Sequence, residues 1–463
     1  MTLPRSSSPL LVRIRQKFPA SPSLAYDDLL HHELAAILTT AQVGSAGRAD
    51  RQSPQGSVPA YAPKTRPKRL AKGPAHRPQI KPGARIAVAV GSRGINDLAA
   101  IVQAVIRALQ SAGAQPFVIP AMGSHGGGTP AGQTALLASY GVTEAALGVP
   151  VRAAMEVRTV GNAVPGFDTV CSVEALGADA VVLINRIKPH TDFGGAIGSG
   201  LLKMLVVGLG KHAGAASFHA AASRHGYERV LQASADLLLR QFPLLCGVAI
   251  LEDQRHRTAR VEVVRPEQIR PREPELCAAA RRLMPRLPFD EIDLLIVDQM
   301  GKNISGTGMD PSVIGRQIHG YSLAEDAPHL RPRVRRLFVR DLTPESHGNA
   351  IGIGLADFAT TRLLCAMDRE ITAVNALTAL SLQGAKVPLA FDTDREALAR
   401  ALATLALPDL REARVLRIRD TLSVEQFDAS TAFLPDLAGR SDLEVIGAPR
   451  PFAFDPTGNL KPL

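Results

Sequence analysis

Short runs of consecutive apolar residues alternate with longer amphipathic segments along most of the chain. Residues 85–90 form the clearest run, Arg-Ile-Ala-Val-Ala-Val, which is typical of a parallel strand covered on both faces. A segment with helical periodicity follows from about 96 to 112, and a second apolar run follows at 115–122. Because strand and helix alternate in this way, the pattern predicts βα units around a parallel sheet.

The same alternation continues in two blocks. The first block predicts strands at 178–185, 244–252 and 260–264, and helices at 130–139 and 227–241. The second block predicts strands at 292–297, 336–342, 387–391 and 415–418, and helices at 359–368 and 394–406. We therefore expect an α/β fold: two α/β domains with mainly parallel sheets, at residues 83–288 and 289–463, and an active site in the cleft between them.

Residues 1–82 have a different character. A strand is predicted at 10–14 and a helix at 24–38, whereas 41–82 is rich in Gly, Ser, Pro, Lys and Arg and predicts a mobile basic segment. Residues 1–82 contain 13 Lys and Arg against 4 Asp and Glu, so they carry +9 of the chain's formal charge of +10. Such a segment is usually solvated, although it can also contact nucleic acid or an anionic surface.

Composition narrows the classes of function. Aromatic residues make up 4% of the chain and Trp is absent, so recognition of nucleic acid by aromatic platforms is not expected. The four cysteines are far apart, which disfavours a disulfide framework or a zinc ribbon and predicts a reducing cytoplasm. We find no pattern of a signal peptide and no apolar run of the roughly 18 residues that a membrane helix needs.

Four unusual loops follow predicted strands, at 91–94, 123–129, 189–200 and 300–310. Each loop carries glycine together with a cationic or imidazole side chain. Since ligands bind beyond the carboxyl ends of strands in open parallel sheets, we expect these loops to converge on one site.

His125 lies in the sequence Gly-Ser-His-Gly-Gly-Gly-Thr, after the strand at 115–122. An imidazole titrates near neutrality and is able to take and return a proton. Gly126, Gly127 and Thr129 precede a predicted helix, where backbone N–H groups hold anions, so we assign them to cofactor binding. The alternative is a loop histidine bonded to the backbone.

His190 and Lys203 are the next candidates. His190 lies in Lys-Pro-His-Thr-Asp, where the alternative is a structural ion pair between Lys188 and Asp192. Lys203 is a single lysine within an apolar stretch, and such a lysine is often nucleophilic or covalently used because burying its charge is costly. The alternative is a side chain that extends to solvent from the edge of a helix.

His212 and His219 are seven residues apart and share a face if their segment is helical. No cysteine or carboxylate cluster accompanies them, so we expect at most one of them to be a single ligand to a metal that is held mainly by another group. Residues 206–214 have glycines that resemble a loosened dinucleotide fingerprint. The acidic residue expected about twenty positions later is absent, which disfavours nicotinamide binding.

The ordered set of these residues resembles lactate racemase and its homologues, the nickel-pincer-nucleotide isomerases. The resemblance covers about residues 80–365 and is carried by Arg93, His125, His190, Lys203 and His219. It implies a cofactor, a pyridinium mononucleotide joined by a thioamide to Lys203, whose nickel is bound by two sulfurs and a carbon of the cofactor and by His219.

The resemblance also implies the catalytic roles. His125 and His190 are the two acid/base residues, one for each face of the substrate, and Arg93 orients the substrate carboxylate. Lys302 is the corresponding lysine of the second domain and reaches into the cleft. Enzymes that synthesise the cofactor are implied as partners.

Three departures from the family bear on the substrate: the Gly-Ser-Arg-Gly turn, the three glycines after His125 and the absence of Trp. Because of these departures, the resemblance supports the cofactor better than it supports lactate as the substrate. We therefore expect a 2-hydroxy acid as the substrate, including larger ones such as sugar acids. The expected reaction is racemisation or epimerisation. The alternatives are an enzyme that binds a phosphate or nucleotide ligand through its Gly-rich loops without nickel, and a non-catalytic binding protein on the same fold.

Overall fold

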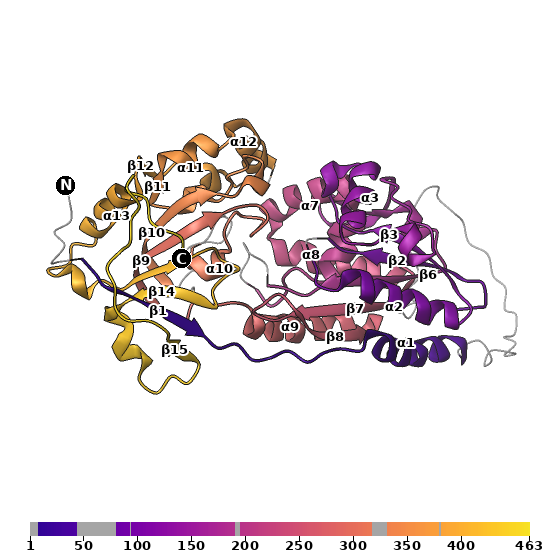
Figure 1. Cartoon of the computed structure of the whole chain (residues 1–463). Coiled ribbons are helices and arrows are strands. Elements are labelled where there is room, and N and C mark those ends of the chain that lie inside the picture. The colour runs from indigo at the N-terminus through magenta and orange to yellow at the C-terminus, as the bar shows by residue number, and fades with distance from the viewer. Residues whose placement is uncertain (1–7, 44–79, 93, 190–194, 317–330, 379–380) are drawn as a thin grey trace, which may run out of the picture.

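Two sheets with helices around them organise the chain (Figure 1). The computed structural model describes residues 8–43, 80–92, 94–189, 195–316, 331–378 and 381–463. Two of the predicted site residues, Arg93 and His190, therefore lie outside the described residues. Within the described parts of the chain, no helix combines the length and apolarity needed to cross a membrane.

The first sheet has five strands in the order β3-β2-β6-β7-β8. Its strands are β2 (Arg85–Val90), β3 (Gln115–Pro120), β6 (Ala180–Arg186), β7 (Leu244–Glu252) and β8 (Thr258–Val264). The first four strands of that order run parallel, and β8 pairs with β7 in the antiparallel direction. β7 is buried along its whole length, as its continuous apolar sequence predicts.

Side chains of β2 alternate between two hydrophobic cores. Ile86, Val88 and Val90 pack on the face covered by α1 (Tyr26–Val43) and α2 (Leu98–Ser111). Ala87 and Ala89 face the other core. That core is formed with α7 (Lys211–His225), α8 (Tyr227–Gln241), α9 (Pro266–Leu283) and the hairpin of β4 (Val157–Val164) and β5 (Phe167–Ser172). Helices on both faces are what a parallel sheet requires.

Short helices complete this part of the chain. They are the 3-10 turn η1 (Gly126–Gly128), α3 (Pro130–Ser139), α4 (Glu144–Leu147), α5 (Val173–Leu176), α6 (Leu201–Lys203) and the π-helical turn η2 (Met204–Gly208). η1, α6 and η2 lie at or beyond the carboxyl ends of the strands, where the candidate site is.

The second sheet has eight strands in the order β12-β11-β10-β9-β13-β14-β1-β15. They are β9 (Glu291–Met300), β10 (Arg333–Leu342), β11 (Phe358–Thr360), β12 (Leu389–Phe391), β13 (Val415–Ile418), β14 (Gln426–Ser430), β15 (Leu443–Val445) and β1 (Leu11–Gln16). The first five strands of that order are parallel, and β14, β1 and β15 continue the sheet in antiparallel pairs. The associated helices are α10 (Pro311–Ile314), α11 (Thr361–Ala366), α12 (Arg369–Thr378) and α13 (Asp394–Ala403).

The prediction of an α/β fold with mainly parallel sheets is confirmed. The N-terminal segment is divided between the two sheets: β1 pairs with β14 and β15 of the second sheet, whereas α1 packs in a core of the first. The sequence alone places both elements in the segment 1–82 and does not indicate this division. Figure 1 shows the chain running from β1 along the lower edge of the molecule, beneath α9 and β8, to α1.

Candidate active site at the carboxyl edge of the first sheet

His125 and Ser92 meet at the ends of two neighbouring strands. Ser92 follows β2 and His125 follows β3, and the parallel register of these strands brings both loops to one edge. The Ser92 Oγ lies 2.5 Å from the Nδ1 of His125, and the imidazole is half-buried. The hydroxyl therefore orients the ring, which is what a residue that moves a proton at its other nitrogen needs.

The three glycines after His125 adopt the left-handed backbone conformation, which glycine accepts more readily than other residues. Gly126, Gly127 and Gly128 have φ values of 63°, 65° and 64°. The Gly128 N–H donates to the His125 carbonyl within the loop, and the N–H groups of Gly126 and Gly127 are the candidates for binding an anion. Thr129 has a different role, because its Oγ1 accepts a hydrogen bond from the Gly132 backbone N–H and caps α3.

A buried glutamine holds this loop in place. Gln133 of α3 is fully buried, and its Nε2 donates to the carbonyl oxygens of Gly123 at 2.9 Å and His125 at 3.3 Å. The Gly123 N–H in turn donates to the carbonyl of Gly208 at the end of η2. The loop that carries His125 is thus fixed to the helical segment that follows Lys203.

Lys203 is the last residue of α6 and stands directly before the π-helical turn η2. Its side chain is half-buried, and its Nζ lies 5.9 Å from the ring centre of Tyr227, within the range of a cation–π contact. Single π-helical turns occur frequently at functional sites. Because the whole segment is helical, no strand precedes the glycines of 206–214, which contradicts the dinucleotide-fingerprint reading.

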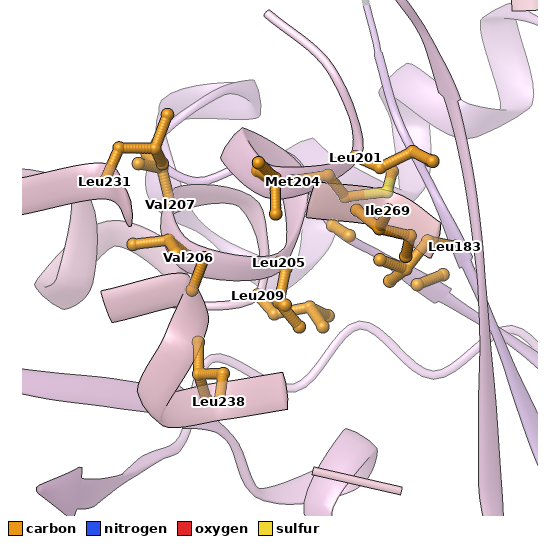
Figure 2. Packing of buried hydrophobic residues seen from close by; sticks show 14 of the residues in the cluster. Leu183, Leu201, Met204, Leu205, Val206, Val207, Leu209, Leu231, Leu238 and Ile269 are labelled. Atoms are coloured by element: carbon orange, nitrogen blue, oxygen red, sulfur yellow. The ribbon is translucent and has the colours of Figure 1, made fainter. Parts of the chain in front are cut away.

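Apolar side chains anchor the segment of α6 and η2 in the hydrophobic core. Figure 2 shows residues of α6 and η2, among them Leu201 and Leu205, packed in one cluster with Leu183 of β6, Leu231 of α8 and Ile269 of α9. The segment is therefore held by three separate elements, and Lys203 is the one residue of 201–210 that is not buried.

His219 lies on α7 close to the same aromatic pair as Lys203. Its ring is 5.9 Å from that of Phe218, and the Phe218 ring is 5.5 Å from that of Tyr227. Both contacts are edge-to-face, the arrangement that aromatic pairs prefer. Because Phe218 and His219 are neighbours in the chain, the contact that the fold adds is the one between Phe218 and Tyr227, whose ring also lies near the Lys203 amine. The side chains of Lys203 and His219 are both half-exposed.

His212 and His219 both belong to α7, as the spacing predicts. His212 is exposed at the start of the helix and packs against the glycine loop, since a Cβ on Gly128 would lie 3.0 Å from the Nδ1 of His212. Over the described ranges, no three His, Cys, Asp or Glu side chains lie close enough together to hold a metal ion.

The most deeply buried lysine of the site region is Lys211, which is 1% exposed. Its Nζ donates to the carbonyl of Pro120 at 2.6 Å, at the carboxyl end of β3. Burial lowers the pKa of Lys211 to about 8. Lys203 stands out in the sequence because its neighbours are apolar, whereas Lys211 lies between glycine and histidine and is not distinguished by its neighbours.

Lys188 lies where the two halves of the molecule meet, whereas the Lys302 amine makes hydrogen bonds within the second half. Lys302 follows β9, and its Nζ donates to the Gly306 carbonyl at 2.7 Å and to the Oδ1 of Asn375 at 2.9 Å. Lys188 follows β6 and forms an ion pair of 3.0 Å with Asp310, which follows β9. The loops at the carboxyl ends of both sheets therefore face each other.

The environment of Asp310 fixes its charge. Burial raises its pKa, but the Lys188 charge and hydrogen bonds from Ser312 outweigh burial, so the pKa is below the usual value. This pairing differs from the alternative weighed from the sequence, an ion pair of Lys188 with Asp192, a residue that lies outside the described ranges.

Together these features define a two-sheet α/β protein with imidazole, amine and glycine-loop groups gathered at facing sheet edges. No family model matches the sequence, and no curated protein is similar to it. Among solved structures, a protein from Thermotoga maritima is 11% identical with a TM-score of 0.44, over 70% of this chain and 72% of that chain. The lactate racemase apoprotein from Thermoanaerobacterium thermosaccharolyticum is 14% identical with a TM-score of 0.39, over 73% of this chain and 76% of that chain. Scores this low do not assign a family or an activity.

Proposed function

We propose that the protein is a racemase or epimerase of a 2-hydroxy acid that works with a lysine-tethered nickel-pincer nucleotide. The observation that carries the proposal is the placement of Lys203 and His219 against the contacting rings of Tyr227 and Phe218. An amine for attachment and one imidazole for the metal are the two protein groups that such a cofactor requires.

The described residues fit this group. A nickel held mainly by donor atoms of the cofactor would need a single protein ligand, and a histidine nitrogen suits it. His219 would be that ligand, Lys203 would carry the thioamide, and the N–H groups of Gly126 and Gly127 would hold the nucleotide phosphate. When bound, the cofactor supplies the acceptor and donor of the hydride at C2 of the substrate.

The protein residues then handle the proton and the orientation. His125, held by Ser92, would remove the hydroxyl proton as the hydrogen at C2 leaves, and the substrate becomes a planar keto acid. His190 would serve as the second base from the opposite face. Arg93 adjoins Ser92 in sequence, and its guanidinium would bind the carboxylate through two hydrogen bonds.

The second half of the molecule would close the site with Lys302. Its amine is held by the Gly306 carbonyl, in the loop after β9, and by the side chain of Asn375 in α12. From there it would contact the carboxylate or a hydroxyl group of the substrate.

The test is co-expression with the enzymes that make the cofactor. The purified protein should contain about one nickel per chain, and its peptide containing Lys203 should show an increased mass. It should also racemise or epimerise a stereopure 2-hydroxy acid. Lys203→Ala should lack the adduct and the activity, while Lys461→Ala, an exposed lysine far along the chain, should keep both. Wild-type protein that gains neither nickel nor an adduct would contradict the proposal.

A second candidate rests on the three consecutive glycines with positive φ, which suit a phosphate-bearing ligand without nickel. Isothermal titration with nucleotides and sugar phosphates distinguishes it. Binding of such a ligand at micromolar concentration by protein that takes up no nickel would favour this reading over the first.

A further inference from the structure

Glu273 is a carboxyl group buried at the start of the helical turn that carries Lys203. It belongs to α9 and is 1% exposed. Its Oε2 accepts a hydrogen bond of 2.9 Å from the Leu202 N–H, and the Leu201 N–H is a further donor to the carboxyl. Glu273 is thus a helix cap supplied from 71 residues away in the chain.

The turn needs a cap from outside because its own N-cap residue cannot supply one. The first N–H groups of a helix have no partner within the helix, and Gly200, the N-cap of α6, has no side chain. A Cβ at Gly200 would lie 2.5 Å from the Oε1 and 2.8 Å from the carboxyl carbon of Glu273. The glycine and the carboxyl therefore occupy complementary space.

A second polar side chain holds the same residue from the other side. The Nδ2 of Asn185, in β6, donates to the Gly200 carbonyl at 2.8 Å. Asn185 also packs against the end of β2, since a Cβ on Gly91 would lie 2.5 Å from its Oδ1. The start of α6 is thus fixed between β6 and α9, next to the loop that bears Ser92.

Burying this carboxyl is costly, which indicates a role beyond filling space. Burial raises the pKa of Glu273 to about 7, and the two backbone N–H groups only partly offset the effect. Among the described residues, its Oε1 has no hydrogen-bond partner. An apolar side chain would fill the same volume without this desolvation cost but would leave the N–H groups of Leu201 and Leu202 unpaired.

We propose that Glu273 is a positioning residue for Lys203: its carboxyl fixes the first turn of α6 and thereby the direction and reactivity of the Lys203 amine. Lys203 follows the capped residues directly and stands immediately before the π-helical turn. The use of this amine for cofactor attachment rests on the proposed function, whereas its positioning by Glu273 does not.

The experiment uses the full chain without cofactor and compares Glu273→Ala, Glu273→Gln and Glu275→Ala, an exposed glutamate on the same helix. Two readouts by mass spectrometry are measured: hydrogen exchange of the peptide covering 200–208, and the rate at which an acylating reagent modifies Lys203. Loss of the cap should speed exchange at 201 and 202 by about tenfold or more and change the labelling rate severalfold. Glu273→Gln keeps an acceptor oxygen and should restore both values to within about twofold.

Gly200→Ala provides a second route that leaves Glu273 in place. The added Cβ displaces the carboxyl, so exchange and labelling should change as in Glu273→Ala. This variant carries the test if Glu273→Ala does not fold. If Glu273→Ala or Gly200→Ala folds and shows the exchange and labelling rates of the wild-type protein, the inference is overturned.

Cofactor loading separates the two claims. If the wild-type protein never acquires an adduct on Lys203, the proposed function fails, but the exchange and labelling results still decide the role of Glu273. If loading is normal in wild type, Glu273→Ala should carry several times less adduct than Glu273→Gln. Equal loading of these two variants would overturn the positioning of the amine.

Discussion

Lys211 is unusual among the lysines of this protein because its amine is enclosed. Its Nζ has the Pro120 carbonyl as a hydrogen-bond acceptor, and the buried thiol of Cys171 lies nearby. Burial raises the pKa of Cys171 to about 12, so this neighbour stays neutral at physiological pH and offers no countercharge. The protonated amine is therefore held at a cost, and the cost should show in the pH dependence of stability.

The pKa of Lys211 is lowered from 10.5 to about 8 in the folded protein. Between these values the unfolded chain binds more protons than the folded one, so the free energy of unfolding rises with pH across this window and the penalty is complete below it. Lys211→Met should remove this rise, which amounts to up to about 3 kcal/mol. Urea unfolding at pH 7.5, 9 and 10 measures it, with Lys461→Met as the control. If the free energy of unfolding depends on pH in the same way in wild type and Lys211→Met, the pKa of the Lys211 amine is not lowered in the folded protein.

At the scale of an element, the glycine loop η1 offers a matched pair of substitutions. Gly126 and Gly127 have nearly the same positive φ, but a Cβ on Gly126 would lie 2.6 Å from backbone atoms of Gly132, whereas a Cβ on Gly127 would meet nothing within 4 Å. Gly127→Ala should therefore cost only the conformational strain, about 1–2 kcal/mol. Gly126→Ala should cost clearly more, because α3 must shift. Urea unfolding of both variants compares them, and equal losses would mean that the contact with Gly132 is relieved without cost.

Elements with regular patterns could be predicted from the sequence. The continuous apolar runs of β2 and β7 and the periodic α8 lie at the predicted residues. α9 was missed because Pro271 and Pro274 lie inside it, where proline normally ends a helix. The hairpin of β4 and β5 was missed because its register is interrupted and it lies outside the main sheets.

Some residues of the candidate site could likewise be predicted from the sequence, and others could not. His125, Lys203 and His219 could be singled out because their chemistry is unusual for their local sequence. Ser92 and Glu273 could not, since an ordinary serine and a glutamate in a charged helix acquire their roles only through contacts with residues 33 and 71 positions away. Those distances are set by strand order and helix packing, which no local pattern encodes.

At the scale of the molecule, the ion pair between Lys188 and Asp310 links the two halves. The carboxylate is nearly buried and the amine is 28% exposed, so a double-mutant cycle of Lys188→Met and Asp310→Asn should give a coupling of about 1 kcal/mol at neutral pH. Because the pKa of Asp310 is lowered, this stabilisation is present above the ordinary carboxyl pKa and is lost as the pH falls through the lower folded value.

Urea unfolding of the four proteins in this cycle gives the coupling, and proteolysis near residues 284–290 reports on the junction. Both Lys188→Met and Asp310→Asn should be cleaved faster there than wild type. A coupling of zero, with unchanged cleavage, would mean that the pair is solvated and does not hold the halves together.

The position of β1 has a consequence for how the chain is completed on the ribosome. Residues 11–16 emerge well before their partners β14 and β15, which lie more than four hundred positions later in the chain. Strand β1 must wait, without these partners, until the intervening residues have been translated. At elongation rates of about 5–20 residues per second this interval lasts on the order of tens of seconds. The first sheet has all of its strands by residue 264 and is able to form during that time, while the second gains its final strand only once residue 445 has been translated.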